Sequence, residues 1–453
     1  MEEMKKRISD SVILRWGILF LVGFVLSVNY YFYDAFSTLK EQLMLEFGLT
    51  NTDYGLFVSF YSIPNTFLLM AVVGGVILDK LGIRRTGFIF IFFMAFGAML
   101  TAYGASKIYS SGGFGYDLMS SFLPNYSPEL KMMLLGRFFY GLGAETSIVV
   151  VSKILVKWFK GKDLALAFGL KVGFGRLGTF AALNISPRLS EEGANLNVAI
   201  WFAAVLVLMG LLAFIIYIMF DIKYDKESDL AGVVKEKQER FKLADIGKIL
   251  GNPAYIYIAM LCLTFYSAVF PFLAFAPDLF FNKYNMTSVE SGQITSILPL
   301  GTLIFTPLFG FLIDKYGKAA SAMFFGALIL FIIHILFAFT DIAPEIPMLL
   351  LGISFSLVPA AMWPSMVRLV EEKQIGTAYG LMYSIQNLGL FFFPILAGVV
   401  LDYANPGVIE NLNYTPTILM FATLGLLGLT FSMLLIKHDR KNKLGMDFPM
   451  NKK

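Results

Sequence analysis

The sequence predicts an all-α membrane protein with about twelve transmembrane helices in two pseudo-symmetric six-helix bundles. Hydrophobic residues make up 57% of the 453 residues and charged residues only 15%, a composition typical of a polytopic membrane protein. Apolar runs of roughly 20 residues, long enough for a helix to cross a bilayer, recur along the whole chain. The two halves also repeat one short motif at equivalent points, which indicates duplicated bundles.

Run length and flanking charge divide the chain into bundles and connectors. The segment 221–252 is dense in charges of both signs and poor in apolar residues, which is typical of a solvated linker. We therefore predict an N-terminal bundle over 1–220, a cytoplasmic linker over 221–252, a C-terminal bundle over 253–436 and a cytoplasmic tail over 437–453. The predicted spans are 12–36, 53–78, 86–105, 131–156, 163–187, 195–220, 253–279, 289–313, 319–340, 345–370, 375–402 and 413–436.

Lysine and arginine set the expected orientation. They gather in alternate connectors, for example at Arg84, Arg85 and Lys157, whereas the connectors 341–347 and 402–414 contain none. Because basic loops stay on the cytoplasmic side, both termini are predicted to be cytoplasmic. Short tails without an acidic dileucine sorting signal favour a prokaryotic protein of the plasma (inner) membrane.

Several classes of function are disfavoured. The net charge of +4 comes from loops beside membrane spans and does not indicate nucleic-acid binding. A single cysteine, Cys262, gives no disulfide framework. The sequence has no Walker A loop, no cluster of metal-ligating Cys and His, and no nucleophile–base constellation. We therefore expect no metal, no cofactor and no enzymatic activity.

Two opposite charges lie deep within predicted spans. In the stretch 136–187, two long apolar runs flank a short basic hinge, and Glu145 and Arg176 both fall near mid-membrane. A charge at that depth costs about 2.5–3.5 kcal/mol on the insertion scale, so such residues face a cavity or each other. They are the first candidates for a binding site.

The repeated motif lies where the second and eighth spans end. GVILDKLGIRR (75–85) and GFLIDKYGK (310–318) share a glycine, an Asp-Lys pair and a second glycine. The motif resembles the cytoplasmic loop of the major facilitator superfamily, and the resemblance implies a gate latch and a transporter of that fold. The predicted motif residues are Gly75, Asp79, Lys80, Gly82, Arg84, Arg85, Asp314 and Lys315. Asp79 can act as a cap or pair across the seam between the halves, and the two arginines can anchor to lipid headgroups; plain positive-inside anchoring is the alternative.

Arg137, in GRFFYGLGAE (136–145), resembles the fourth-helix arginine of the same superfamily. Two interpretations remain open for it. It organises a polar network with the first and second spans, or it is a structural arginine paired with a carbonyl or carboxylate.

A closer resemblance extends over almost the whole chain. The segments YSIPN (61–65), GRFFYGLGAE, WFKGKDLALAFGL (158–170), GRLG (175–178) and GTAYGLMYSIQNLGL (376–390) are similar to the lysosomal dipeptide transporters of this superfamily. The resemblance implies uniport of dipeptides by alternating access. It also implies that Glu145 receives the peptide amino group, that Arg176 receives the carboxylate, and that Trp363 lines the pocket.

The chemistry of a dipeptide agrees with that assignment. A zwitterionic dipeptide carries opposite charges at most about 7 Å apart, which one carboxylate and one guanidinium on neighbouring helices can hold. A clamp on the main-chain ends ignores side chains and accepts many dipeptides. The alternative is a Glu145–Arg176 salt bridge that holds the bundle together, although a buried pair contributes little net stability.

Other residues complete the candidate site. Lys171 is five residues before Arg176 and is expected on a different helix face. Three interpretations of Lys171 are open: it favours acidic peptides, it contacts Asp34, or it extends its ammonium to the cytoplasm. Asp34 is an outer gate contact or a helix-end residue. The remaining candidates are Tyr33, which with Asp34 forms a further resembling pair at the end of the first span, Tyr61 and Asn65 from the segment 61–65, and Tyr266, Gln386 and Asn387 as neutral donors.

Three hypotheses for function follow. The first is facilitated dipeptide uniport; the second is proton-coupled symport of a peptide or small organic anion, with Glu145 carrying the proton. The third is a sensor or scaffold that binds without flux. The lysosomal transporters depend on an accessory subunit, but we expect this chain to work alone in the lipid bilayer, as a monomer.

Overall fold

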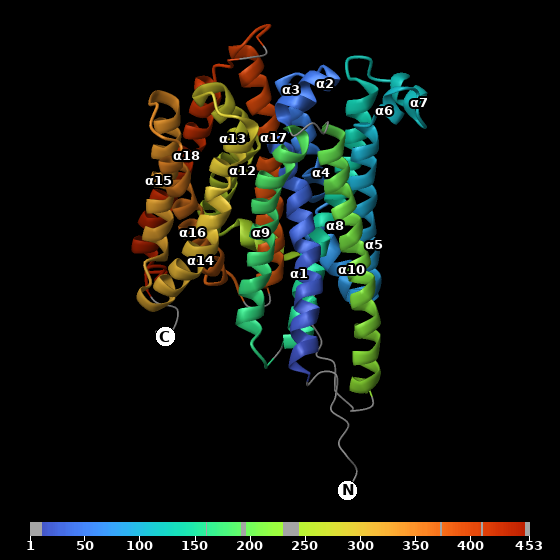
Figure 1. Ribbon diagram of the computed structural model, residues 1–453. Coiled ribbons are helices and arrows are strands. Elements are labelled where there is room, and N and C mark those ends of the chain that lie inside the picture. Colours follow the sequence, from blue (N-terminus) through green and yellow to red (C-terminus); the bar gives the residue numbers. More distant parts are fainter. Residues whose placement is uncertain are drawn as a thin grey trace.

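The computed structural model describes residues 11–159, 161–191, 196–229, 244–371, 374–408 and 411–448, all helical or irregular (Figure 1). The first half contains α1 (Val12–Asp34), η2 (Ala35–Ser37), α2 (Lys40–Phe47), α3 (Asn51–Phe60), α4 (Ile63–Phe67), α5 (Met70–Gly104), α6 (Lys107–Ser110), α7 (Tyr116–Ser120), α8 (Pro128–Phe159), α9 (Leu164–Glu191) and α10 (Leu196–Asp229). After α11 (Ala244–Leu250), the second half contains α12 (Pro253–Tyr284), α13 (Ser288–Thr295), α14 (Ile297–Tyr316), α15 (Ala319–Phe339), α16 (Glu345–Val367), α17 (Ile375–Ala404) and α18 (Thr415–Asn442).

Eleven helical segments of the described chain are long and apolar enough to cross a membrane. The predicted span 53–78 is divided among α3, α4 and the first part of α5, so it does not count as one continuous helix. The all-helical multi-pass prediction is confirmed, with the second span divided into shorter helices.

The interruption has a counterpart in the second half. α3 starts at a capping box, in which the Thr50 hydroxyl accepts from the Asp53 amide and the Asp53 carboxylate accepts from the Thr50 amide. α13 starts in the same way at Thr287 and Glu290. α3 then ends at Phe60, before α4, and α13 ends at Thr295, before α14. A capping box satisfies two of the unpaired amides at a helix start. Both breaks therefore lie at equivalent positions of the two halves.

A sharp turn separates the end of the second span from the third span. α5 is interrupted at Gly82, whose φ of 77° and ψ of 172° are outside the helical region and favour glycine. The Thr86 hydroxyl lies 3.4 Å from the Ile77 carbonyl oxygen, nine residues earlier. In a continuous helix these residues would be roughly 13 Å apart, so the chain reverses here.

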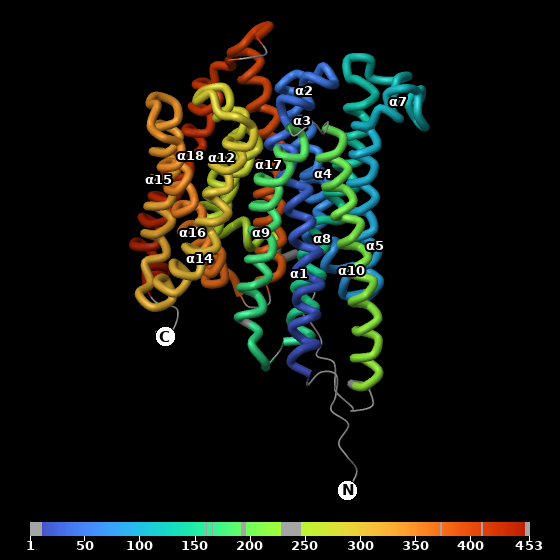
Figure 2. The backbone as a smooth tube through the Cα atoms, viewed as in Figure 1, coloured from blue at the N-terminus to red at the C-terminus, as the bar shows by residue number. Residues whose placement is uncertain are grey.

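The two halves meet along two seams. α3 and α4 of the first half pack on α17, and α9 packs on α13 and α14 of the second half. Figure 2 shows α9 between the halves, with α1 beginning and α18 ending at the lower face. We call this lower face the terminal face and the opposite face, which carries α2 and α13, the distal face.

The helices extend past the predicted bundle limits. α10 continues to Asp229 and α18 to Asn442, beyond the predicted boundaries at 220 and 436. α11 occupies part of the predicted linker, whose residues 230–243 lie outside the described chain, as do residues 1–10 and 449–453. The division into bundles, linker and tail stays a prediction.

Candidate functional site: a central cavity between the two halves

A cavity of about 700 Å³ lies between the halves. Its wall is built from α1, α5, α8 and α9 on one side and from α12, α16 and α17 on the other. Such a volume is in the usual range for a small-molecule site. Of the predicted substrate-binding residues, the wall contains Tyr33, Tyr61, Glu145, Lys171, Arg176, Tyr266, Trp363, Gln386 and Asn387.

Glu145 on α8 and Arg176 on α9 both line this cavity without forming an ion pair. The Tyr61 hydroxyl donates a hydrogen bond to Oε1 of Glu145. The guanidinium carbon of Arg176 lies 5.1 Å from the centre of the Phe355 ring, a cation–π contact from the other half. Among the ion pairs of the described residues, none joins these two side chains. The structure therefore leaves a carboxylate and a guanidinium facing one chamber.

Aromatic side chains of the second half form the opposite wall. The Trp363 indole stacks on Tyr383 and Tyr379, with ring centres 4.7 Å and 5.7 Å apart. Its Nε1 donates to the Tyr266 hydroxyl over 3.0 Å. These contacts fix the indole plane, so the wall is a rigid apolar surface with a few polar edges.

Two amides of α17 lie beside that aromatic wall. Oε1 of Gln386 is 3.8 Å from Sγ of Cys262, and Nδ2 of Asn387 donates to the Tyr383 carbonyl over 3.0 Å. Oδ1 of Asn387 is buried and has no protein hydrogen-bond partner.

Lys171 lines the cavity at a different level from Arg176. Its Nζ donates to the Ser152 hydroxyl over 2.6 Å and lies 5.7 Å from the centre of the Phe168 ring. The structure shows no contact with Asp34. The five-residue spacing predicted a separate helix face, yet both cations reach the same chamber.

Asp34 and Asn65 do not lie in the cavity wall. Oδ2 of Asp34 accepts from the Thr179 hydroxyl over 2.6 Å, which ties the end of α1 to α9 within the first half. Asn65 is fully buried in α4, and neither side-chain atom has a hydrogen-bond partner in the structure. The structure thus places both candidates behind the wall rather than in it.

Arg137 is enclosed by aromatic rings. The side chain is 1% exposed, and its guanidinium carbon lies within 6.0 Å of five ring centres: Tyr33, Phe36, Phe57, Tyr61 and Tyr140. Its Nε donates to the Phe57 carbonyl over 3.4 Å, and no carboxylate of the described chain pairs with it. The arginine joins α1, α3 and α8 mainly through cation–π contacts.

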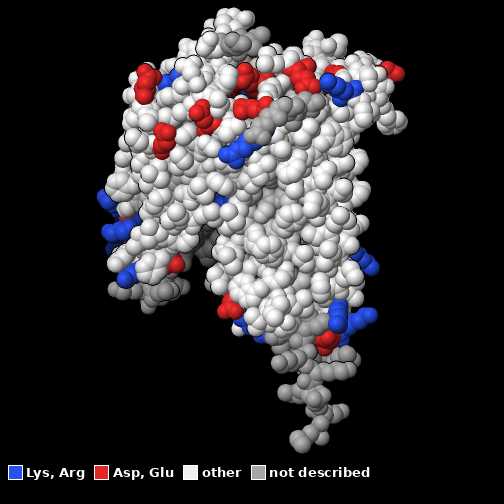
Figure 3. Space-filling model, viewed as in Figure 1, with Lys and Arg blue, Asp and Glu red and all other residues white. Residues whose placement is uncertain are grey.

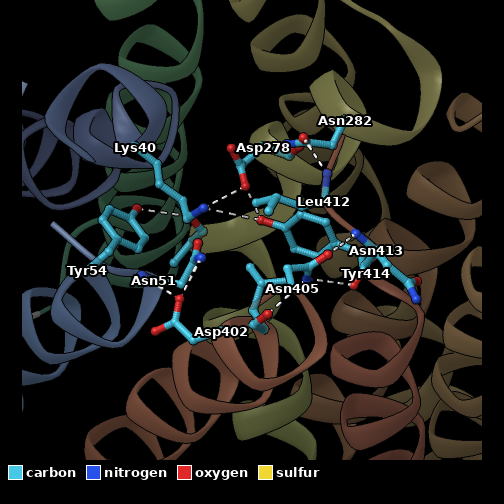
Figure 4. Close-up of polar contacts among 12 residues, drawn as sticks. Lys40, Asn51, Tyr54, Asp278, Asn282, Asp402, Asn405, Leu412, Asn413 and Tyr414 are labelled. Carbon is cyan, nitrogen blue, oxygen red and sulfur yellow. Dashed lines mark hydrogen bonds and ion pairs between the residues drawn. The ribbon is translucent and has the colours of Figure 1, made fainter. Parts of the chain in front are cut away.

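Charged and polar groups of the two halves contact one another at the distal face (Figure 4). Nζ of Lys40 lies 2.6 Å from Oδ2 of Asp278 on α12, with the two side chains 0% and 5% exposed, and the Tyr414 hydroxyl donates to the same carboxylate. Nearby, the Asp402 carboxylate of α17 accepts from the backbone amides of Asn51 and Thr52 at the start of α3. The Asp402 carboxylate is stabilised there because an anion at a helix N-terminus is favourable. Both this contact and the Lys40–Asp278 ion pair join the first half to the second.

Glycines bring the two halves into backbone contact at this seam. A Cβ at Gly55 of α3 would overlap the Pro394 carbonyl oxygen of α17, and a Cβ at Gly398 would overlap the Asn51 carbonyl oxygen. The backbones of α3 and α17 are therefore in direct contact here, with no side chain between them.

The cavity is open toward the terminal face. Asp79 and Gly376, which lie toward that face on their helices, are part of its wall, whereas none of the distal contact residues is. Figure 3 shows a hollow between the two halves on the same side, with acidic residues gathered mainly at the distal face. The structure is thus closed at one face and accessible from the other.

Comparison with known protein families identifies the family of this chain. The family model for the major facilitator superfamily matches residues 19–394 and 272–446. The chain belongs to the major facilitator superfamily. It is a multi-pass membrane transporter and not an enzyme.

Relatives and solved structures of the major facilitator superfamily resemble the chain over most of its length. The lysosomal dipeptide transporter MFSD1 of Mus musculus is 32% identical over 402 residues, covering 86% of this chain and 80% of that protein. The probable galactarate/D-glucarate transporter GudP of Bacillus subtilis is 22% identical over 419 residues, covering 86% of each chain. The crystal structure of the nucleoside transporter NupG has a TM-score of 0.71 at 14% identity, covering 93% of this chain and 99% of that one.

The major facilitator loop motif makes its ion pairs within the first half. Asp79 pairs with Lys153 of α8 over 2.5 Å rather than across the seam, and with Gly75 it lines the cavity. Arg84 pairs with Asp221 and Asp225 of α10. The pair of Asp79 thus lies within the first half and not across the seam, while anchoring of Arg84 and Arg85 to lipid headgroups stays a prediction. Lys80 and Arg85 are exposed beside the Gly82 turn.

The second copy of the motif has fewer partners. Asp314 and Lys315 are exposed at the end of α14, and Lys315 lies over the Phe311 and Tyr316 rings. The role of either copy as a gate latch stays a prediction.

Sequence reasoning missed several wall residues: Asn29, Tyr30, Ser152, Phe270, Thr377, Tyr379 and Tyr383. The signal on α17 was available. Gly376, Tyr379, Tyr383, Gln386 and Leu390 recur at three- and four-residue spacing and all line the cavity, as one helix face does. Single aromatics in membrane spans usually pack against other helices, which is why the remaining rings gave no signal.

A metal site is not visible. Within the described ranges, no group of three His, Cys, Asp or Glu side chains is placed to hold an ion.

Proposed function

We propose that this transporter carries dipeptides across the membrane by alternating access, as a facilitated uniporter. The observation that supports this is the pair of unpaired opposite charges, Glu145 and Arg176, facing one chamber. Glu145 accepts the peptide ammonium and Arg176 receives the terminal carboxylate in a bidentate contact. The 32% identity to a protein named as a dipeptide transporter supports the same substrate class.

The wall beyond the two charges suits variable side chains. Trp363, Tyr379 and Tyr383 offer flat apolar surface without a charged group. Apolar contact of this kind stabilises many side chains and specifies few, so the peptide ends supply the recognition.

The terminal face is assigned to the cytoplasm on the basis of its Lys and Arg residues. The open hollow then faces inward, and the distal contacts close the outer side. We place the protein in the plasma (inner) membrane as a monomer that works without a protein partner.

Binding tests the clamp directly. Purified protein is screened by thermal shift with Ala-Ala, free alanine and small dicarboxylates, together with Glu145→Gln and Arg176→Ala. Loss of a charge-assisted contact is expected to weaken Ala-Ala binding by roughly 10- to 100-fold in each variant. Glu345→Gln and Arg188→Ala, which change exposed residues outside the cavity, serve as matched controls and should bind as the parent does. Unchanged Ala-Ala stabilisation in both site variants would remove these residues from the site.

Transport distinguishes uniport from its alternatives. In proteoliposomes, uniport predicts dipeptide counterflow without a pH gradient. Accumulation against a gradient that a protonophore abolishes would instead show proton symport. Glu145, whose carboxylate accepts a hydrogen bond from the neutral Tyr61 hydroxyl, is the group that would carry the proton. Binding without any flux would support the sensor hypothesis.

A further inference from the structure

The cavity carries one more positive charge than a zwitterion satisfies. Its charged wall residues are Glu145, Arg176, Lys171 and Asp79. Asp79 is already paired with Lys153 over 2.5 Å. The remaining groups are one carboxylate and two cations, so a dipeptide held by its two ends leaves Lys171 without a counter-charge.

The contacts of Lys171 within the described chain are with neutral groups. Its ammonium donates to the Ser152 hydroxyl, and that hydroxyl in turn donates to the Ile148 carbonyl over 2.8 Å. The Phe168 ring is the other contact. An ammonium has three donors, so two remain for an acceptor that enters the chamber. Among the ion pairs of the described residues, none includes Lys171.

The position of Lys171 fits a side chain rather than a peptide end. On α9, Lys171 is five residues from Arg176, a rise of about 7.5 Å toward the terminal face. Its partner Ser152 is seven residues from Glu145 along α8, a rise of about 10 Å in the same direction. A dipeptide spans roughly 7 Å between its ends, and a flexible lysine together with an Asp or Glu side chain can bridge the remaining distance.

We propose that Lys171 binds the side-chain carboxylate of the substrate, so that dipeptides with one acidic residue and a net charge of −1 are the preferred class. This inference rests on the dipeptide function proposed above and names its substrate. An acidic side chain receives a charge-assisted hydrogen bond from Lys171, while Glu145 and Arg176 hold the ends.

The test compares isosteric dipeptides. Affinities for Ala-Glu and Ala-Gln are measured by calorimetry on the purified protein, together with Ala-Ala. Ala-Glu is expected to bind about 10- to 100-fold more tightly than Ala-Gln, the range for gaining one charge-assisted hydrogen bond. The advantage should decrease in high salt because the cavity is open to solvent.

Variants assign the preference to one side chain. Lys171→Met should lower the affinity ratio of Ala-Glu to Ala-Gln to about one, whereas Lys171→Arg should retain the ratio of the parent. Lys223→Met, which changes an exposed lysine of α10, is the matched control and should behave as the parent.

Three results would overturn the proposal. The first is equal affinities of the parent protein for Ala-Glu and Ala-Gln, and the second is an unchanged difference between these affinities in Lys171→Met. Equal weakening of all three dipeptides in Lys171→Met would assign the residue to structure or gating. Each of these leaves Ala-Ala binding by the parent in place; absence of any dipeptide binding would instead reject the dipeptide function, and this inference with it.

Discussion

Replacing Lys40 by methionine is expected to favour separation of the two halves at the distal face, where Lys40 of α2 contacts Asp278 of α12. We call this contact region the distal seam. The Lys40 ammonium and the Asp278 carboxylate lie 2.6 Å apart and are 0% and 5% exposed. Removing one partner of a buried ion pair costs about 3–5 kcal/mol, because the other charge stays buried without compensation. The Tyr414 hydroxyl still donates to Asp278, so we take the lower value. About 3 kcal/mol corresponds to roughly a 100-fold shift toward conformations in which Asp278 is hydrated.

Cysteine labelling measures this shift. Thr38 is 6% exposed and lies against Gly292 of α13, across the seam from its own half. The assay uses Thr38→Cys in a Cys262→Ser background, since serine retains a donor for Gln386. If the reaction with a membrane-impermeant maleimide follows the open population, Lys40→Met should raise the labelling rate by about two orders of magnitude.

A double variant separates charge from contact. Lys40→Met combined with Asp278→Leu removes both charges, and replacing a buried pair by apolar residues is often neutral. Its labelling rate should return close to that of the parent. A rate in Lys40→Met equal to the parent would show that the pair does not hold the seam. Equally fast labelling in the double variant would show that an uncompensated charge is not the cause.

Two further predictions concern packing. Gly55→Ala places a methyl group against the Pro394 carbonyl oxygen, which should destabilise the closed seam by about 1–3 kcal/mol and raise the labelling rate of Thr38→Cys. Gly17→Ala, whose methyl group would meet no atom within 4 Å, is the control and should leave this rate unchanged. An unchanged rate in Gly55→Ala would mean that the backbone relaxes around the methyl group. Arg137→Leu removes the cation from its ring cage and should lower the melting temperature in detergent, whereas the exposed Arg85→Leu should change the free energy of unfolding by at most about 0.5 kcal/mol. Equal melting temperatures for the two arginine variants would contradict a structural role for the cage.

Most of the fold follows from hydrophobic run length, because a bilayer imposes one length on every span. The division of the second span was not predicted, since Ser62 and Pro64 are compatible with a continuous membrane helix. The capping boxes at Thr50 and Thr287 mark where α3 and α13 start at the distal face, and not where these helices end.

The candidate site was predictable where a charge lies deep in a span. Glu145 and Arg176 were found on that basis and line one cavity. Asn65 was inferred from similarity alone, and the structure places it behind the wall because α4 turns its side chain into the protein. The contacts of Asp79 and Arg84 were not predictable, because pairing partners on α8 and α10 are set by tertiary packing rather than by the motif.

The glycine contacts between α3 and α17 have a consequence for how often the halves can separate. Where main chain rests on main chain, few side chains interlock, so parting the surfaces requires little exchange of rotamers. A carrier that repeats its cycle many times benefits from a join of this type. The polar contacts of Asp278 and Asp402 then stabilise the closed arrangement of the halves. The glycine contacts allow the two helices to pack again in the same position after each separation.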